Sequence, residues 1–167
     1  MQCKKVLFIG GIKSGKSKLA EEYILQHSKT KPIYLATNEF FDAEMEKRVL
    51  QHQKQRQNTF DTLEEPVKLY DTLQQLQIPV LVEGVSMWIN NMLYRKFTEE
   101  VIYKEIERVC TLDNDIVFVL DDVGCSVVSE YKLVRQFVDI NGRVAQILAS
   151  NVDEVYHVVA GIATKIK

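Results

Sequence analysis

The chain has 167 residues, of which 46% are hydrophobic and 26% are charged, and its net charge is −2 at pH 7. This size and composition predict an ordinary globular protein with a single domain over residues 1–167. The charge gives no electrostatic reason to expect nucleic acid or a membrane surface as a partner, and no apolar run approaches the ~20 residues of a membrane span. With no signal-peptide pattern and three widely spaced cysteines (Cys3, Cys110 and Cys125), we expect free thiols in a reducing cytoplasm.

A glycine-rich segment follows the first apolar run of the chain. Residues 6–9 have the pattern of a short buried strand, and residues 19–27 place apolar side chains at helical spacing. The segment between them matches G-x-x-x-x-G-K-[ST], the pattern of phosphate-binding loops. We call it the glycine-rich loop; it consists of Gly10, Gly11, Ile12, Lys13, Ser14, Gly15, Lys16 and Ser17. In such a loop the backbone N–H groups surround phosphate oxygens, Lys16 reaches the terminal phosphates and the Ser17 hydroxyl binds Mg²⁺.

The rest of the chain alternates between strand and helix patterns. Apolar runs predict strands at 33–36, 80–83, 116–120 and, bent at Gly161, 155–166. Helical spacing and capping residues predict helices that begin near Asp42, after Pro66, at Ser86, at Thr98 and at Ser129. This alternation predicts an α/β domain with a mostly parallel central sheet, and together with the loop a P-loop NTPase-like three-layer domain.

Acidic residues end two of the predicted strands. Glu83 follows the apolar residues 80–82, and Asp121 and Asp122 follow residues 116–120. A nucleotide site needs a carboxylate that holds Mg²⁺, directly or through water. Either position meets this need. The longer apolar strand slightly favours Asp121, and an acid that merely caps the next helix is the alternative for any one of them.

His52 is the second candidate for chemistry. On the helix predicted to begin near Asp42 it shares a face with Met45 and Val49, a pattern typical of a packing residue. A neutral imidazole in this position can also serve as a proton shuttle or attack the α-phosphorus of a nucleotide. Spacing alone does not distinguish these roles. Arg56 belongs to a basic run nearby, which is either a solvated surface or a group that neutralises a triphosphate.

Several segments together point to a known family. They are residues 10–17, 34–37, 42–45, 48–52, 81–88 with Asn91, 123–124, 130, 135–139, 142–143 and 159–167. In these segments the chain resembles the bifunctional adenosylcobinamide kinase/adenosylcobinamide-phosphate guanylyltransferases of cobalamin biosynthesis. The glycine-rich loop alone is shared by many families, whereas the segment around His52 and the last residues are far more specific.

The resemblance implies a two-step enzyme that uses GTP, ATP and Mg²⁺. It would phosphorylate adenosylcobinamide, and then transfer GMP from GTP to that phosphate through a guanylylated His52. The resemblance favours Glu83 over Asp121 as the Mg²⁺ ligand that acts with Ser17. It also implies that Lys16 is a catalytic residue. Nucleotide contacts are implied for the glycine-rich loop and for Ala36, Thr37, Asn38, Arg56, Glu64 and Glu83. The resemblance also implies a homotrimer.

The chain departs from the family pattern mainly in its second half, where the resemblance places the corrinoid side of the site. The departures are Asp121, Asp122, Ser126, Ser129 and Ala145, with Gly84 and Lys13 elsewhere. Alternatives to the two-step enzyme are one that performs only the guanylyl transfer, one that acts on a variant corrinoid, and a non-catalytic NTP-binding regulatory subunit. A regulatory subunit has no need of a nucleophilic histidine, so the presence of His52 distinguishes the enzyme from the regulatory subunit.

Overall fold

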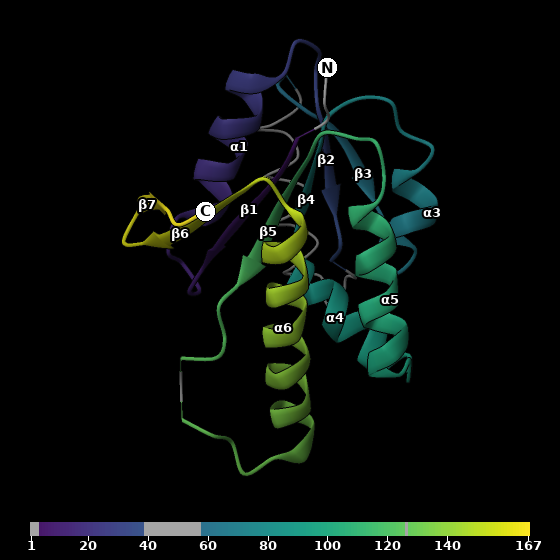
Figure 1. The fold of residues 1–167 in the computed structure, drawn as a ribbon, viewed down its shortest axis with the longest axis vertical. Coiled ribbons are helices and arrows are strands. Elements are labelled where there is room, and N and C mark those ends of the chain that lie inside the picture. The colour runs from purple at the N-terminus through teal and green to yellow at the C-terminus, as the bar shows by residue number, and fades with distance from the viewer. Residues whose placement is uncertain (1–3, 39–57, 126) are drawn as a thin grey trace.

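The protein folds around one seven-stranded sheet (Figure 1). A computed structural model describes residues 4–38, 58–125 and 127–167. Across the sheet the strands run in the order β3-β2-β4-β5-β1-β6-β7. In chain order they are β1 (Lys5–Gly10), β2 (Ile33–Ala36), β3 (Asp61–Glu64), β4 (Val80–Glu83), β5 (Ile116–Asp121), β6 (Glu154–Val159) and β7 (Ile162–Lys165).

Helices cover both faces of the sheet. They are α1 (Lys16–His27), α3 (Leu69–Leu73), α4 (Val85–Tyr94), α5 (Glu99–Cys110) and α6 (Lys132–Asn151). Ala20 and Ile24 of α1 pack on one face, in a cluster with Val6, Phe8 and Val119. The other four helices of the described ranges pack on the opposite face, in a larger cluster centred on residues such as Leu7, Trp88, Ile106, Phe118 and Val144 (Figure 1). The three-layer arrangement predicted from the sequence is therefore confirmed.

Strand direction brings the ends of the inner strands to one edge of the sheet. β1 pairs in parallel with both β5 and β6, and β2 pairs in parallel with both β3 and β4. β4 and β5 are also parallel, so among the described strands only β7 runs against its neighbour. Parallel sheets bind ligands beyond the carboxyl ends of their strands, and here the glycine-rich loop leaves β1 at that edge.

Four local features differ from the sequence-based expectations. Residues 61–64 form an edge strand that we did not predict, and the helix after Pro66 is limited to Leu69–Leu73. The segment 155–166 is not one bent strand but an antiparallel hairpin, β6–β7, that turns at Ala160 and Gly161. Ser129 does not cap α6; its hydroxyl accepts a hydrogen bond from the Tyr131 N–H at 3.2 Å, and the helix begins at Lys132.

Other expectations agree with the structure. The strands at 33–36 and 80–83 have the expected bounds, and β5 extends only one residue beyond the expected end. Thr98 occupies the N-cap position of α5, although its side chain makes no capping hydrogen bond there. The helix expected near Asp42 lies outside the described residues. No helix within the described ranges is long and apolar enough to cross a bilayer.

Candidate active site

The glycine-rich loop joins β1 to α1 in a conformation that ordinary side chains rarely adopt. Lys13 and Gly15 both have positive φ angles, 60° and 95°. The Ser14 N–H donates to the Gly11 carbonyl at 3.1 Å, which closes the turn. The loop therefore wraps back over the N-terminus of α1, where unpaired N–H groups and the helix dipole favour an anion.

Lys16 is the first residue of α1 and is only 7% exposed. Its ammonium pairs with the Asp121 carboxylate, with Nζ 2.5 Å from Oδ1, and donates to the Gly11 carbonyl at 3.2 Å. Asp121 reaches this position because it is the register partner of Gly10 across β1 and β5. A nearly buried ammonium requires an anionic partner, and Asp121 fills that role.

Ser17 and Glu83 meet at the same edge of the sheet. The Ser17 hydroxyl donates to Glu83 Oε1 at 2.9 Å, although the residues lie 66 positions apart. A hydroxyl and a carboxylate are oxygen ligands of the kind Mg²⁺ prefers, so this pair fits a nucleotide-bound magnesium ion. The described residues contain no cluster of three or more His, Cys, Asp or Glu side chains able to hold a metal alone.

Ser14 carries a buried polar atom inside the loop. Within the described chain its hydroxyl oxygen has no hydrogen-bond partner, and the residue is only 9% exposed. The space is closely bounded, because a Cβ added to Gly10 would lie 2.8 Å from this oxygen and 2.3 Å from the Val158 carbonyl oxygen. Buried hydroxyls are nearly always hydrogen-bonded, so this one points to a polar ligand of the loop.

The ends of β2, β3 and β4 bring further predicted residues together. Ala36 is the register partner of both Glu64 and Glu83. Thr37 follows it, is fully buried, and donates from its hydroxyl to the Gly84 carbonyl at 2.7 Å. Asn38 comes next and lies within 4 Å of a Cβ placed on Gly84. The structure therefore brings Ala36, Thr37, Asn38, Glu64 and Glu83 to one side of the loop.

Gly84, a departure from the family pattern, has a local explanation. Its φ of 84° lies in the left-handed region, and an added Cβ would lie 3.0 Å from the Thr37 hydroxyl oxygen. Glycine adopts this conformation without strain. As the N-cap of α4, Gly84 lets the helix begin at Val85, close to the end of β4, while keeping the Thr37 hydrogen bond.

A buried polar network behind Asp121 was missed by sequence reasoning. The Ser86 hydroxyl contacts Asn141 Oδ1 at 2.7 Å and accepts from the Asp121 N–H at 3.0 Å. The Asn141 amide donates to the Asp121 carbonyl at 2.9 Å. The network ties α4 and α6 to the end of β5, and so positions Asp121. The only sequence signal was an asparagine among the apolar positions of an amphipathic helix.

Some expected residues are not placed by the structure. His52, Arg56, Cys3 and Ser126 lie outside the described residues. Asp122 faces the chain that follows it: it accepts from the Gly124 N–H at 3.3 Å, and Cys125 Sγ lies 3.5 Å from its other oxygen. That hydrogen bond raises the pKa of the Cys125 thiol. Ala145 is half-buried on α6 and packs against the core.

The fold and the loop define the class of the protein as a P-loop NTPase-like domain, as the sequence predicted. The chain is similar to the flagellar accessory protein FlaH from Methanocaldococcus jannaschii, with a TM-score of 0.54. That match has 12% sequence identity and covers 99% of this chain and 79% of the other. At this identity the similarity concerns the fold alone.

Sequence comparison identifies the family. The profile of the CobU family, described as cobinamide kinase / cobinamide phosphate guanyltransferase, matches residues 6–166. The bifunctional adenosylcobalamin biosynthesis protein CobU of Escherichia coli (strain K12) is 33% identical, over 97% of this chain and 99% of the relative. The protein of the same name from Salmonella typhimurium is 34% identical over the same shares. The chain belongs to this family, and the transferase class predicted from its sequence is confirmed.

Proposed function

We propose that the glycine-rich loop binds the phosphates of a nucleoside triphosphate, ATP or GTP, and that Lys16 moves from Asp121 to those phosphates. The observation that carries this proposal is the nearly buried Lys16 ammonium, 2.5 Å from Asp121 at the carboxyl edge of the sheet. A triphosphate offers that ammonium a stronger anionic partner than one carboxylate. The unpartnered Ser14 hydroxyl and the N-terminus of α1 support the same placement.

Ser17 and Glu83 are the proposed holders of Mg²⁺. Their contact at 2.9 Å supports Glu83 over Asp121, which pairs with Lys16 instead. When bound, the ion would neutralise phosphate charge. Ala36, Thr37, Asn38, Glu64 and Arg56 are proposed contacts of the GTP nucleoside. For the first four, support comes from their common place beside β2 and β4.

The family to which the chain belongs implies two reactions, and we propose that these residues carry them out. In the first, the aminopropanol hydroxyl of adenosylcobinamide attacks the γ-phosphorus of the donor; its proton is lost and the nucleoside diphosphate leaves. In the second, a ring nitrogen of His52 attacks the α-phosphorus of GTP, which forms a P–N bond and releases pyrophosphate. The phosphate of the corrinoid then attacks the same phosphorus and breaks the P–N bond, so that His52 is regenerated.

The histidine step can be tested by incubating the protein with α-labelled GTP and Mg²⁺. We expect a covalent label that is stable in base and lost in acid, and no label after His52→Ala or after chelation of Mg²⁺. His27→Ala is the control, because His27 is an exposed histidine at the end of α1. Equal labelling of the His52→Ala protein would refute the assignment, and a wild-type protein that takes no label would favour the regulatory alternative.

The kinase step has its own test, namely phosphorylation of adenosylcobinamide by the wild type and by Lys16→Ala. We expect the substitution to reduce kcat/KM by about 100-fold or more, since it removes the cation that reaches the terminal phosphates. Lys18→Ala is the control, because Lys18 is exposed and pairs with Glu22 on the surface of α1. An enzyme that takes the guanylyl label but phosphorylates no corrinoid would be the guanylyltransferase-only alternative.

We also propose that one domain carries both reactions, in the cytoplasm and as a homotrimer. Cys110 and Cys125 are free thiols, in keeping with a reducing compartment. Apolar side chains are exposed at the beginning of α6 and just before it, which supports assembly. We call them the α6 apolar patch: Val127, Val128, Tyr131, Leu133 and Val134.

A further inference from the structure

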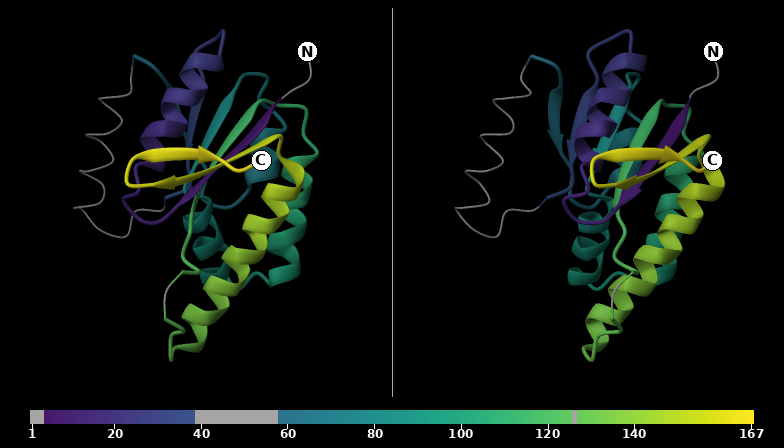
Figure 2. Two further views of the ribbon diagram at one scale, coloured as in Figure 1. Left: turned by 60° about the vertical axis from the view of Figure 1, so that its left-hand side comes forward. Right: turned by 90° about the vertical axis from the view of Figure 1, so that its left-hand side faces the viewer.

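The turn of the β6–β7 hairpin lies directly against the glycine-rich loop (Figure 2). The Gly161 N–H donates to the Ser14 carbonyl at 2.7 Å. A Cβ added to Gly15 would lie 3.1 Å from the Cα of Gly161. Ala160 and Gly161 both have positive φ angles, 51° and 80°, as a tight two-residue hairpin turn requires. We call residues 159–162 the hairpin tip.

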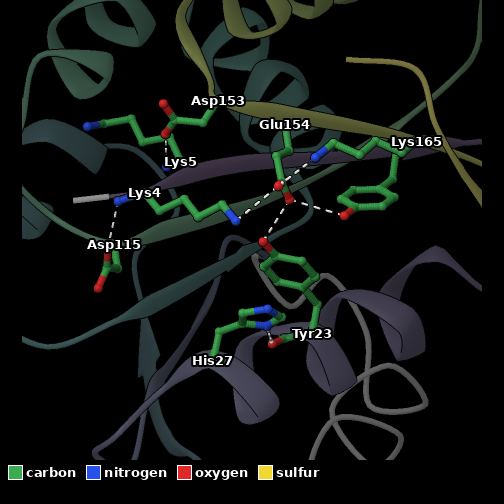
Figure 3. Close-up of polar contacts among 9 residues, drawn as sticks. Lys4, Lys5, Tyr23, His27, Asp115, Asp153, Glu154 and Lys165 are labelled. Carbon is green, nitrogen blue, oxygen red and sulfur yellow. Dashed lines mark hydrogen bonds and ion pairs between the residues drawn. The ribbon is translucent and has the colours of Figure 1, made fainter. Parts of the chain in front are cut away.

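The hairpin is held in this place by a carboxylate at its far end (Figure 3). Glu154, the first residue of β6, contacts the ammonium groups of Lys165 at 2.7 Å and Lys4 at 3.0 Å. It also accepts from the hydroxyls of Tyr23 at 2.8 Å and Tyr156 at 3.1 Å. These contacts join β6 to β7, to α1 and to the residue before β1. Because both ends of the hairpin are fixed, the hairpin tip has a defined position beside the loop.

The hairpin tip exposes an apolar pair. Val159 and Ile162 face each other across the two strands, so their side chains share one face. They are 58% and 70% exposed, whereas the neighbouring Val158 is fully buried in the cluster under α1. The hairpin tip carries no charged side chain.

Charge is distributed unequally on the two sides of β1. On one side, the carboxylates of Asp121 and Glu83 lie at the ends of β5 and β4, where they contact Lys16 and Ser17. Beyond β6 lies the uncharged hairpin tip. The terminal phosphates of a donor nucleotide and their magnesium ion suit the first side. With the phosphates placed there, the uncharged nucleoside would extend from the loop toward the side of β6. On that side apolar groups can pack against the faces of its base.

We propose that the hairpin tip binds the nucleoside of the phosphoryl donor while its phosphates lie in the glycine-rich loop. This inference rests on the proposed binding of nucleotide by the loop. It places the donor nucleoside on the opposite side of β1 from Ala36 and Glu64, the proposed contacts of guanine. The two reactions therefore share one phosphate loop but use separate nucleoside sites, and changes in the hairpin tip affect one reaction only.

The test uses a double variant, Val159→Ala with Ile162→Ala, and the single variant Ile162→Ala. We would measure binding of a non-hydrolysable ATP analogue with an imido bridge between the β- and γ-phosphates, and of inorganic tripolyphosphate. We expect the double variant to bind the analogue about 10-fold more weakly and the single variant to show part of this loss. Affinity for tripolyphosphate and the rate of guanylylation by GTP should not change. Ile166→Ala is the matched control, because Ile166 is 64% exposed and lies beyond the end of β7.

Unchanged affinity for the analogue in the double variant would overturn the inference. An equal loss of affinity for tripolyphosphate would also overturn it, since the hairpin tip would then only shape the loop. A change in oligomeric state would overturn it as well, because Val159 and Ile162 would then belong to a subunit interface. A wild-type protein that binds neither the analogue nor tripolyphosphate would instead contradict the proposed function of the loop itself, and the inference with it.

Discussion

At the scale of single residues, the ammonium of Lys16 is held by the Asp121 carboxylate and the Gly11 carbonyl. A phosphate ligand must displace Asp121 from this ammonium, so the carboxylate competes with the ligand. The Asp121 side chain is one-third exposed, so water and salt screen its charge. This screening limits the strength of the ion pair between Lys16 and Asp121.

Asp121→Asn should therefore tighten the binding of pyrophosphate in the absence of Mg²⁺, by about 2- to 5-fold. Titration calorimetry of the wild type and the variant at low salt would measure it. Asp122→Asn is the control, since Asp122 contacts Gly124 and Cys125 rather than Lys16. Weaker binding by the Asp121 variant would show that this carboxylate organises the loop and does not compete with its ligand.

At the scale of elements, Asn141 connects α6 to β5 and to Ser86 on α4. Asn141→Ala leaves the buried Ser86 hydroxyl and the Asp121 carbonyl each short of one partner. We expect the free energy of unfolding to fall by about 1–3 kcal/mol, as measured by urea denaturation. Asn151→Ala should have a smaller effect, because Asn151 is exposed and its amide donates to the Ile147 carbonyl of its own helix. Similar losses in both variants would contradict a special role for the network.

The contacts of Glu154 predict how stability depends on pH. Partial burial alone would raise the pKa of this carboxyl, but hydrogen bonds from Lys165, Lys4, Tyr23 and Tyr156 outweigh it and lower the pKa from 4.5 to about 2. A pKa that is lower in the folded state stabilises the fold fully above pH 4.5, and this stabilisation is lost as the pH falls toward 2. The pH window of the effect is therefore acidic.

We accordingly expect Glu154→Gln to be less stable than the wild type at pH 6, and this difference to shrink between pH 4.5 and pH 2. Urea denaturation over this range would measure it. Glu22→Gln, on the exposed surface of α1, provides the control. A difference that stays constant with pH would show that the contacts act through packing and not through the charge of Glu154.

At the scale of the whole molecule, the beginning of α6 extends away from the sheet (Figure 2). The exposed side chains of the α6 apolar patch lie on and just before this end of the helix. If this patch forms the contact between subunits, Leu133→Glu places a charge in that contact and should convert a particle with the mass of three chains into monomers. Light scattering coupled to size-exclusion chromatography would measure the mass. Leu25→Glu, at an exposed aliphatic residue on α1, should leave it unchanged. A trimer that survives Leu133→Glu would place the interface elsewhere.

Much of this architecture follows from patterns local in sequence. Buried parallel strands such as 80–83 and 116–120 appear as continuous apolar runs, so their bounds and the acids that end them could be predicted. The edge strand at 61–64 has the sequence Asp-Thr-Leu-Glu and is largely exposed, so it carries no such run. Its formation depends on pairing with β2, which only the fold supplies.

In the candidate site, too, features that are local in sequence could be predicted, and contacts between distant residues could not. The glycine-rich loop was predictable from its motif, and the positions of Glu83 and Asp121 from the ends of two apolar runs. The preference for Glu83 as the Mg²⁺ ligand came from the family resemblance, since strand length alone slightly favoured Asp121. The pairing of Lys16 with Asp121, and the network through Ser86 and Asn141, join residues far apart in the chain. The contact between Ser14 and Gly161 was likewise unpredictable, since the tail was expected to be one strand with a bend rather than a hairpin that returns to the loop.

That contact between Ser14 and Gly161 has a consequence for biosynthesis. A nascent chain that has emerged from the ribosome only through residue 153 contains every residue proposed to hold phosphate. It still lacks β6, the parallel neighbour of β1, and the N–H group that caps the Ser14 carbonyl. We expect such a chain to bind nucleotide poorly, and affinity to rise only after the hairpin has been synthesised. The glycine-rich loop is thus translated well before the hairpin that completes its surroundings.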